Sequence, residues 1–241
     1  MQYHALTDIG FMREKNQDAY LTALNEYGDL LMLVADGIGG GKAGEVASAE
    51  TASYFERVFA ESGPFSQLED VAGFLSYHIG HINKLILDMS HHNLAYEGMG
   101  TTLTGVLVTS LGDTVFNCGD SRVYGIFEGK LVPLTKDDTY INQMIEEGRI
   151  TQEEAIDHPK KHYLVKAIGI FEESQADIHP IEAMERYLVC SDGLHSYVSD
   201  EEMTDIIMND ELTIKEKTIA LKELALRKGG YDNITVILYQ R

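Results

Sequence analysis

Four aspartates of this chain stand where an apolar, strand-like run begins or ends, and they constrain what the chain can fold into. They are Asp36, Asp120, Asp192 and Asp232, and glycine flanks the first three. A carboxylate at a strand end is held by a stiff element. Several such carboxylates in one fold repel one another unless cations lie among them. The pattern therefore predicts a hard, oxygen-ligated metal centre and metal-assisted chemistry.

The charge of the chain argues against several classes of function. Its 241 residues carry a formal net charge of −20, and 44% are hydrophobic, as in globular proteins with a large core. The basic face that nucleic acid or an anionic membrane surface requires is not expected in so acidic a chain. No apolar run reaches membrane-spanning length and no secretory signal begins the chain. Cys118 and Cys190 lie inside apolar runs, so we expect buried, reduced thiols and a cytoplasmic protein.

The order of the periodic segments predicts the fold class. Strand-like runs over 3–8, 20–24 and 30–36 precede helical spacing over 43–61 and 66–91, and strands return over 101–134. A short helical excursion follows at 140–158. Later helices open at two capping boxes, Ser199 with Glu202 and Thr213 with Glu216, before a last strand at 234–239. Strands adjacent in sequence favour antiparallel sheets, so we expect one α+β domain over residues 1–241, with helices covering the sheets.

Six short segments carry the residues that could do chemistry. They are 13–18 with Arg13 and Asp18, 34–45 with Asp36 and Gly37, 100–102, 119–122 with Asp120, 190–194 with Asp192, and 229–235 with Asp232. The guanidinium of Arg13 is a planar fork of donors that matches two phosphate oxygens. The Gly37 carbonyl is exposed for ligation in a glycine-rich run. Asn233 and Thr235 are placed to hold the Asp232 loop by hydrogen bonds.

A nucleotide-binding loop is the main rival interpretation of the glycine-rich run. Gly41-Lys42 resembles the end of a P-loop, but that motif needs glycine at position 36 and serine or threonine at position 43. Those positions hold Asp36 and Ala43, so the pattern fails twice. Each of the six segments alone is also compatible with an ordinary turn, surface ion pair or bulge. Their combination and order carry the interpretation.

The ordered motifs, from Thr7-Asp8-Ile9-Gly10 to Asn233-Ile234-Thr235, resemble the metal-dependent protein serine/threonine phosphatases of the protein phosphatase 2C-like family, in its bacterial subtype. The likeness runs over essentially the whole chain. It implies a four-layer α-β-β-α sandwich, in which two antiparallel sheets are flanked by helix pairs. It also implies a flap segment at about 137–158, bracketed by Leu134-Thr135-Lys136-Asp137 and His158-Pro159.

The resemblance also assigns site residues. It implies that Asp36, the Gly37 carbonyl, Asp192 and Asp232 hold two Mn²⁺ or Mg²⁺ ions, and that Asp18 reaches one of them directly or through water. Asp120 with Asp192 matches a third ion site found in bacterial members. Arg13 is implied to grip the substrate phosphate.

The implied reaction is hydrolysis of phosphoserine and phosphothreonine. Asp36 would bridge the two ions, and a hydroxide that both ions share would attack the phosphorus directly. Relatives place a histidine where this chain has Ile38 or Gly41, and their Asp-His pair reads Asp137-Asp138 here. The usual proton donor for the leaving oxygen is therefore missing. A metal-bound water is the expected donor, and His162 is a weaker candidate to approach the substrate.

The expected partners are phosphorylated proteins, targets of a serine/threonine kinase, and the chain is expected to act as a monomer. A catalytically weak, phosphatase-like binding module that regulates partners is the alternative function. The missing histidine favours that alternative, and the retained carboxylates oppose it. A nucleotide-hydrolysing switch is disfavoured by the failed P-loop.

Overall fold

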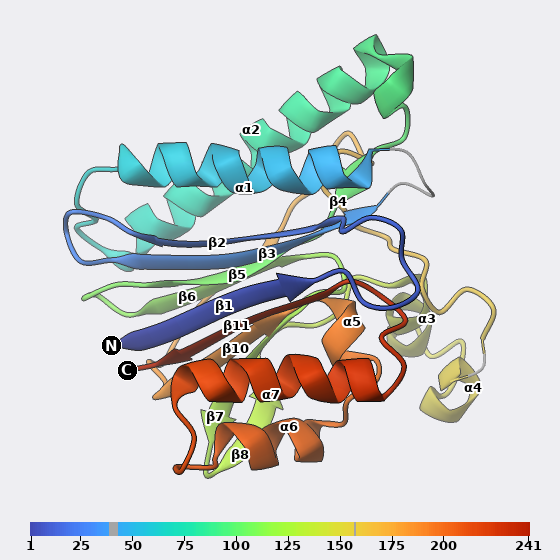
Figure 1. Ribbon diagram of the computed structural model, residues 1–241. Coiled ribbons are helices and arrows are strands. Elements are labelled where there is room, and N and C mark those ends of the chain that lie inside the picture. Colours follow the sequence, from blue (N-terminus) through green and yellow to red (C-terminus); the bar gives the residue numbers. More distant parts are fainter. Residues whose placement is uncertain (39–42, 157) are drawn as a thin grey trace.

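Two antiparallel sheets pack face to face and helices cover both outer faces of the pair (Figure 1). The computed structural model describes residues 1–38, 43–156 and 158–241. Helices α1 (Gly44–Ala60) and α2 (Leu68–His92) lie over one sheet, and α6 (Asp200–Ile207) and α7 (Ile214–Arg227) lie over the other. This arrangement confirms the α+β class and the four layers expected from the sequence.

The sheets bring together strands that are far apart in the chain. One sheet has the order β1 (Gln2–Asp8), β11 (Ile234–Gln240), β10 (Arg186–Cys190), β7 (Arg122–Phe127) and β8 (Lys130–Pro133). The other has the order β2 (Asp18–Leu24), β3 (Leu30–Ile38), β5 (Leu103–Val108), β6 (Asp113–Cys118) and β9 (Asp177–Ile181), with β4 (Gly100–Thr101) paired to the end of β3. The first and last strands pair along their whole length, from Gln2 opposite Gln240 to Asp8 opposite Ile234.

The burial of strand β3 explains why its sequence is a continuous apolar run. Its residues from Leu30 to Ala35 are fully buried, because one face packs under α1 and the other faces the second sheet. A strand covered on both faces has no solvent side, so apolar and polar residues do not alternate along it. The run therefore delivers Asp36 from one of the most enclosed parts of the molecule.

The predicted elements are confirmed with small differences. Both capping boxes are present, at the starts of α6 and α7. The first of the strands expected within 101–134 is broken at Thr102, where the Thr102 amide donates to the Asp36 carbonyl at 2.8 Å. The short helix α5 (Asp192–His195) was not among the predicted elements.

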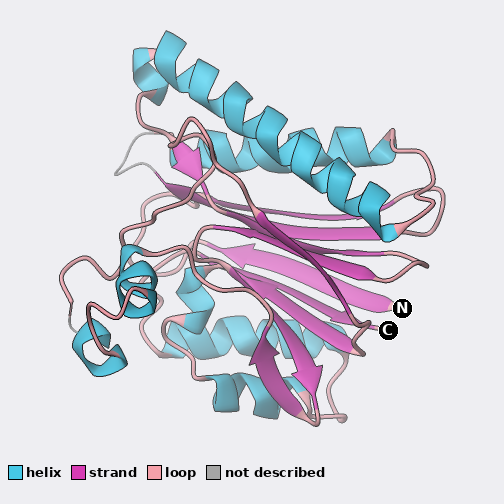
Figure 2. Ribbon diagram, turned by 180° about the vertical axis from the view of Figure 1, so that it is seen from behind, coloured by secondary structure: helices cyan, strands magenta, loops and turns pink. Residues whose placement is uncertain are grey.

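The first part of the connection between β8 and β9 stands outside the layers (Figures 1 and 2). It contains α3 (Tyr140–Glu146) and α4 (Gln152–Ile156). Its two ends are joined, since Thr139 forms an isolated bridge with Leu164 and the Tyr140 amide donates to the Tyr163 carbonyl at 2.7 Å. The assignment of 137–158 as a flap stays a prediction, and Asp157 lies outside the described residues.

Two simpler expectations can be compared directly with the structure. Both cysteines are buried and unpaired, as expected. Within the described ranges, no helix is both long enough and apolar enough to cross a membrane.

Candidate active site

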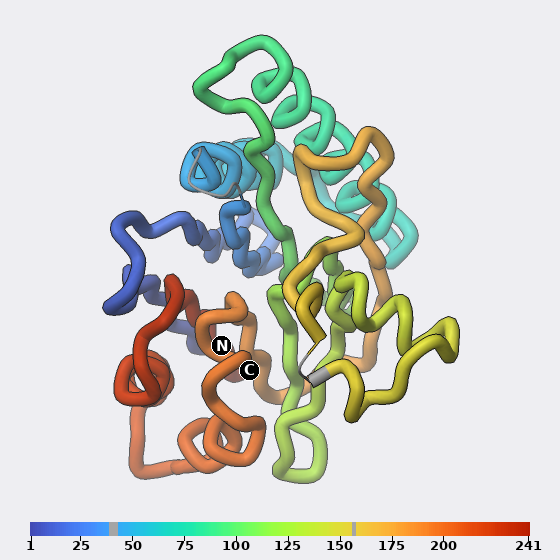
Figure 3. The backbone as a smooth tube through the Cα atoms, turned by 90° about the vertical axis from the view of Figure 1, so that its right-hand side faces the viewer, coloured from blue at the N-terminus to red at the C-terminus, as the bar shows by residue number. Residues whose placement is uncertain are grey.

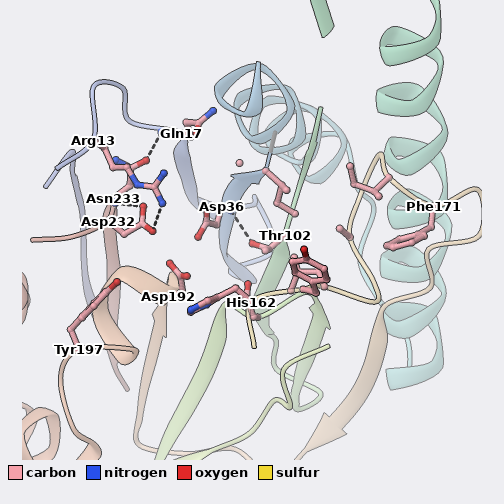
Figure 4. Close-up of a pocket in the computed structure, with 17 residues that line it drawn as sticks. Arg13, Gln17, Asp36, Thr102, His162, Phe171, Asp192, Tyr197, Asp232 and Asn233 are labelled. Carbon is pink, nitrogen blue, oxygen red and sulfur yellow. Dashed lines mark hydrogen bonds and ion pairs between the residues drawn. The ribbon is translucent and has the colours of Figure 1, made fainter. Parts of the chain in front are cut away.

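The strand ends that carry the predicted ligands meet at one end of the two sheets (Figure 3). A cavity of about 660 Å³ opens there, the size of pockets that enclose drug-sized ligands. Its lining includes Arg13, Asp36, Gly37, Asp120, Asp192 and Asp232 (Figure 4). Asp18 lies directly behind, opposite Asp36 in the β2–β3 register. The structure thus gathers every site residue that the sequence predicted, from segments more than 200 residues apart.

Asp18 is held by hydroxyl groups from the opposite sheet. Its Oδ2 accepts hydrogen bonds from Ser191 Oγ at 2.7 Å and from Thr235 Oγ1 at 2.6 Å. Ser191 directly precedes Asp192, and Thr235 follows Asp232 by three residues. The same two bonds therefore fix Asp18 and fix the loops that carry the other two carboxylates.

The Asp192 and Asp232 loops touch backbone to backbone. A Cβ at Gly193 would overlap the carbonyl oxygen of Asn233, so only glycine permits this approach. Asn233 then ties the pair to the loop that carries Arg13. Its side-chain amide donates to the carbonyls of Ile9 and Lys15 at 2.9 and 3.0 Å. The Gln17 amide donates to its Oδ1 at 2.8 Å. These bonds confirm the supporting role expected for Asn233 and Thr235.

Arg13 lies at the edge of the cavity and pairs with one of the predicted ligands. Its Nη2 is 2.6 Å from Asp232 Oδ2, and half of its side chain is exposed. The hydrogen bond to Asp232 is the main reason that the pKa of Arg13 is raised. The guanidinium keeps further donors free of this bond, which a phosphate at the cavity mouth can accept.

Burial and mutual repulsion make the carboxylates costly to ionise. Burial, followed by the neighbouring carboxylates, raises the pKa of Asp36 and that of Asp192 well above their usual range. Burial likewise raises the pKa of Asp18 to about 6 and that of Asp120 to about 7. A cation among these groups would stabilise their ionised forms.

The donor set fits divalent ions. Asp18 Oδ1 and Asp192 Oδ1 are buried with no hydrogen-bond partner in the protein. Buried polar atoms are rarely left so, and a hard cation satisfies carboxylate oxygens directly. As they stand, no three His, Cys, Asp or Glu side chains within 1–38, 43–156 and 158–241 group tightly enough to hold one ion. The carboxylates must therefore draw closer together to share one.

His195 belongs to the site and sequence reasoning missed it. Its Nε2 lies 2.9 Å from the carbonyl oxygen of Asp120. A carbonyl only accepts, so this nitrogen carries the proton. Burial lowers the pKa of His195 to about 4, which keeps the ring neutral. The histidine thus fixes the Asp120 turn. The available signal was its place three residues after Asp192, which is about one turn away if the segment is helical.

The positions where this chain departs from the family pattern are Ile38, Gly41 and the Asp137-Asp138 pair, and the structure describes all of them except Gly41. Ile38 lines the cavity, whereas Gly41, like the rest of 39–42, lies outside the described residues. The Asp137-Asp138 pair supports the base of the protruding segment: Asp137 accepts from Arg122 Nε and Nη2 at 2.7 and 2.8 Å, and Asp138 accepts from the Gly119 amide at 3.0 Å. Neither lines the cavity, but His162 does.

Comparison with known proteins decides the family. The family model described as Protein phosphatase 2C matches residues 13–226. A serine/threonine phosphatase named stp, from Listeria welshimeri, is 32% identical over 237 residues, which is 98% of this chain and 94% of that protein. The chain belongs to the protein phosphatase 2C family. This confirms the resemblance drawn from the motifs.

Solved structures of protein phosphatase 2C relatives share the fold. The S. agalactiae serine/threonine phosphatase superposes with a TM-score of 0.93 at 32% identity, covering 100% of this chain and 99% of its own. The catalytic domain of the serine threonine protein phosphatase PstP, solved in complex with 2 manganese ions, gives a TM-score of 0.83 at 34% identity. That match covers 98% of this chain and 96% of the other.

The raised carboxyl pKa values predict an unusual pH dependence of stability for this protein phosphatase 2C chain. The folded state binds more protons than the unfolded state between the ordinary carboxyl pKa of about 4 and the raised values, so stability falls as pH rises through that window. Melting of chelator-treated protein should therefore occur at a higher temperature near pH 5 than near pH 8. Mn²⁺ should raise the melting temperature more at the higher pH, where protons no longer compete.

The Asp36→Asn variant is the matched control for this pH series. It removes one of the crowded charges, so its melting temperature in chelator should vary less with pH. A chelator-treated wild-type protein that gains stability on going from acid to neutral pH would contradict the electrostatic argument.

Proposed function

We propose that this protein phosphatase 2C chain is a metal-dependent hydrolase that removes phosphate from phosphoserine and phosphothreonine in proteins. The observation that carries the proposal is one cavity in which buried carboxylates from separate strand ends face a guanidinium. The carboxylates suit hard cations, and the guanidinium suits the phosphate that such cations bind. The names of the relatives, and the two manganese ions of one of them, support the same activity.

The residues that would hold two Mn²⁺ or Mg²⁺ ions are Asp36, Gly37 through its carbonyl, Asp192 and Asp232, with Asp18 directly behind Asp36. Asp120, together with Asp192, is proposed for a third ion. When bound, such ions lower the pKa of a solvent molecule for attack on phosphorus and bring positive charge to the cavity. That charge matters because a chain with a net charge of −20 otherwise repels an anionic substrate.

Arg13 is proposed to orient the phosphate. Its loop is held by the Asn233 hydrogen bonds to Ile9 and Lys15, so the guanidinium is presented on a fixed edge of the cavity. A phosphate that accepts two of its N–H groups is held with its oxygens in a defined plane. Orientation of this kind, with charge stabilisation, supplies most of the catalysis in phosphoryl transfer.

The leaving oxygen of serine or threonine needs a proton, and the histidines used by relatives are replaced here by Ile38 and Gly41. Among the described residues that line the cavity, His162 is the only imidazole. We propose His162 as the group that protonates the leaving oxygen, in place of the metal-bound water expected from the sequence. Imidazole is the commonest general acid in enzymes because its pKa lies near neutrality.

The remaining features of the proposal concern context. The substrates are phosphorylated proteins, the enzyme opposes a serine/threonine kinase in signalling, and it acts as a cytoplasmic monomer. Residues 137–158 form the flap of a single domain that spans 1–241. The alternative, a weakly active module that binds phosphoproteins, differs in one measurable property, turnover.

The metal requirement is tested with p-nitrophenyl phosphate, Mn²⁺ and a chelator. Wild-type protein should hydrolyse it only with the metal, and Asp36→Asn should reduce turnover by about 100-fold or more, as expected for loss of a key ligand or of its support. The control is Asp113→Asn. Asp113 is buried at the start of β6, at the end of that strand away from Asp120, so its substitution should lower stability and leave turnover unchanged. Activity that persists in chelator, or a fully active Asp36→Asn, would overturn the proposal.

The role of Arg13 is tested by comparing Arg13→Ala and Arg13→Lys. Loss of charge-assisted hydrogen bonds to phosphate should lower kcat/KM by about 10- to 100-fold in Arg13→Ala. Arg13→Lys should recover part of it, since lysine keeps the charge and loses the fork. Arg227→Ala, on α7 and away from the cavity, is the control. An unchanged kcat/KM in Arg13→Ala rejects the clamp.

The role of His162 is tested by leaving-group dependence. A phosphoserine peptide releases a basic alkoxide that needs a proton, whereas p-nitrophenyl phosphate releases a weakly basic phenolate that does not. His162→Gln should therefore lower kcat for the peptide by about 100-fold, within the usual range for general acids, and spare the aryl phosphate. Equal effects on both substrates would show that His162 does not protonate the leaving oxygen and that the proton comes from water. His179→Gln, on β9, is the control.

A further inference from the structure

The cavity has two chemically unlike sides (Figure 4). The acidic side carries Arg13 and the carboxylates. A second set of lining residues, which we call the apolar wall, consists of Leu164, Ala167, Ile170 and Phe171, and Phe171 lies across the cavity from Arg13. An ion or a phosphate gains nothing from such a surface, yet Ile170 and Phe171 keep 37% and 38% of their surface exposed. Adjacent exposed apolar side chains that line a cavity suit an apolar group of a ligand.

The apolar wall is built rigidly. Asn83 of α2 is 3% exposed, and its side chain is used entirely to hold this segment. Its Oδ1 accepts from the Gly169 amide at 2.7 Å, and its Nδ2 donates to the Phe171 carbonyl at 3.0 Å. A buried amide that satisfies the backbone on both sides of Ile170 fixes where that side chain lies. The wall is thus in place before any ligand arrives, which reduces the entropy lost on binding.

The distance between the apolar wall and the carboxylates is also fixed. Ile168 exchanges two backbone hydrogen bonds with Thr101, at 2.8 and 2.9 Å. Thr101 Oγ1 in turn donates to the Asp36 carbonyl at 2.9 Å. A Cβ at Gly100 would lie 2.5 Å from Ile170 Cγ1, so the bare glycine is what lets Ile170 settle on β4. The strand that carries Asp36 and the segment that carries the apolar wall therefore lie on the two sides of β4.

The apolar surface continues beyond the cavity. A second hollow, lined among others by Leu87, Leu94 and Gly98, shares Ile170 with the cavity. Leu94 is 83% exposed. Arg13 and Ile170 line the same cavity, so an extended peptide whose phosphate lies at Arg13 can run along the cavity towards Ile170.

We propose that the apolar wall selects the substrate sequence: the enzyme prefers phosphorylated segments that carry a leucine-like or aromatic side chain near the phosphoserine or phosphothreonine in sequence. The inference rests on the proposed function, because it needs the phosphate to lie between Arg13 and the carboxylates. The adjacent side chain then buries itself against Ile170 and Phe171. A chain without such a residue leaves this surface wet.

The experiment measures phosphate release from matched phosphoserine peptides in Mn²⁺. One reference peptide carries serine at the positions from −2 to +2, and four others each replace one of these by leucine. Burying one leucine should raise kcat/KM by about 10- to 100-fold at one or two positions on the same side. Serine at all positions serves as the internal reference, so the result is a ratio that protein quality does not affect.

Variants then assign the preference to the apolar wall. In the double variant Ile170→Ser/Phe171→Ser, the ratio of kcat/KM for the leucine peptide to kcat/KM for the serine peptide should fall to near one. Asn83→Ala should reduce the ratio as well, since it releases the wall without altering its side chains. Ile219→Ser, at an isoleucine 38% exposed on α7, and Phe127→Ser, at an exposed phenylalanine at the end of β7, are the matched controls and should keep the full ratio.

The outcomes separate the two proposals. Metal-dependent release at equal rates from all five peptides rejects the apolar wall and leaves the phosphatase standing. A ratio that survives in the double variant also rejects it. No chelator-sensitive release from any peptide rejects the phosphatase itself. The wild-type comparison needs no variant, so poor folding of a variant does not leave the inference untested.

Discussion

Ser191 and Thr235 donate hydrogen bonds across the interface between the sheets to one oxygen of Asp18, and most of the site depends on this contact. The two donors belong to one sheet or its loops and the acceptor to the other. Because each donor is next to or close to a predicted ligand, the bonds set the spacing among Asp18, Asp192 and Asp232 together. The same contact holds mutually repelling carboxylates around one cavity, where a cation would offset their repulsion.

The fold supplies rigidity where the chemistry needs it. β3 is enclosed on both faces, and it delivers Asp36 together with the short strand β4. From β4 the hydrogen bonds continue to Ile168 and, through Asn83, to Phe171. The proposed phosphate site and the apolar wall therefore rest on neighbouring chain segments that hydrogen bonds join to one another. These bonds keep the carboxylates and the apolar wall at a fixed separation when a substrate binds.

Much of this was readable from the sequence, and what was not has physical causes. Apolar runs that stop at aspartate marked Asp36 and Asp192, because a strand buried on both faces is a continuous apolar run in the sequence. His195 was missed because a four-residue helix has no period to detect. Asn83 was missed because one polar residue in a helix is ordinary until its partners are known. Asp137 and Asp138 broke the family pattern, and only tertiary contacts show that they anchor the protruding segment.

The pairing of the first and last strands has a mechanical consequence. Gln2 lies opposite Gln240 at the far end of the sheet, and Asp8 lies opposite Ile234, two residues from Asp232. Force applied to the two ends would open β1 and β11 one hydrogen bond at a time, as a zipper opens, rather than shear them all at once. The rupture would advance towards the catalytic cavity and reach it last. Tension on the chain would thus be absorbed by the strand pair before it could disturb the carboxylates.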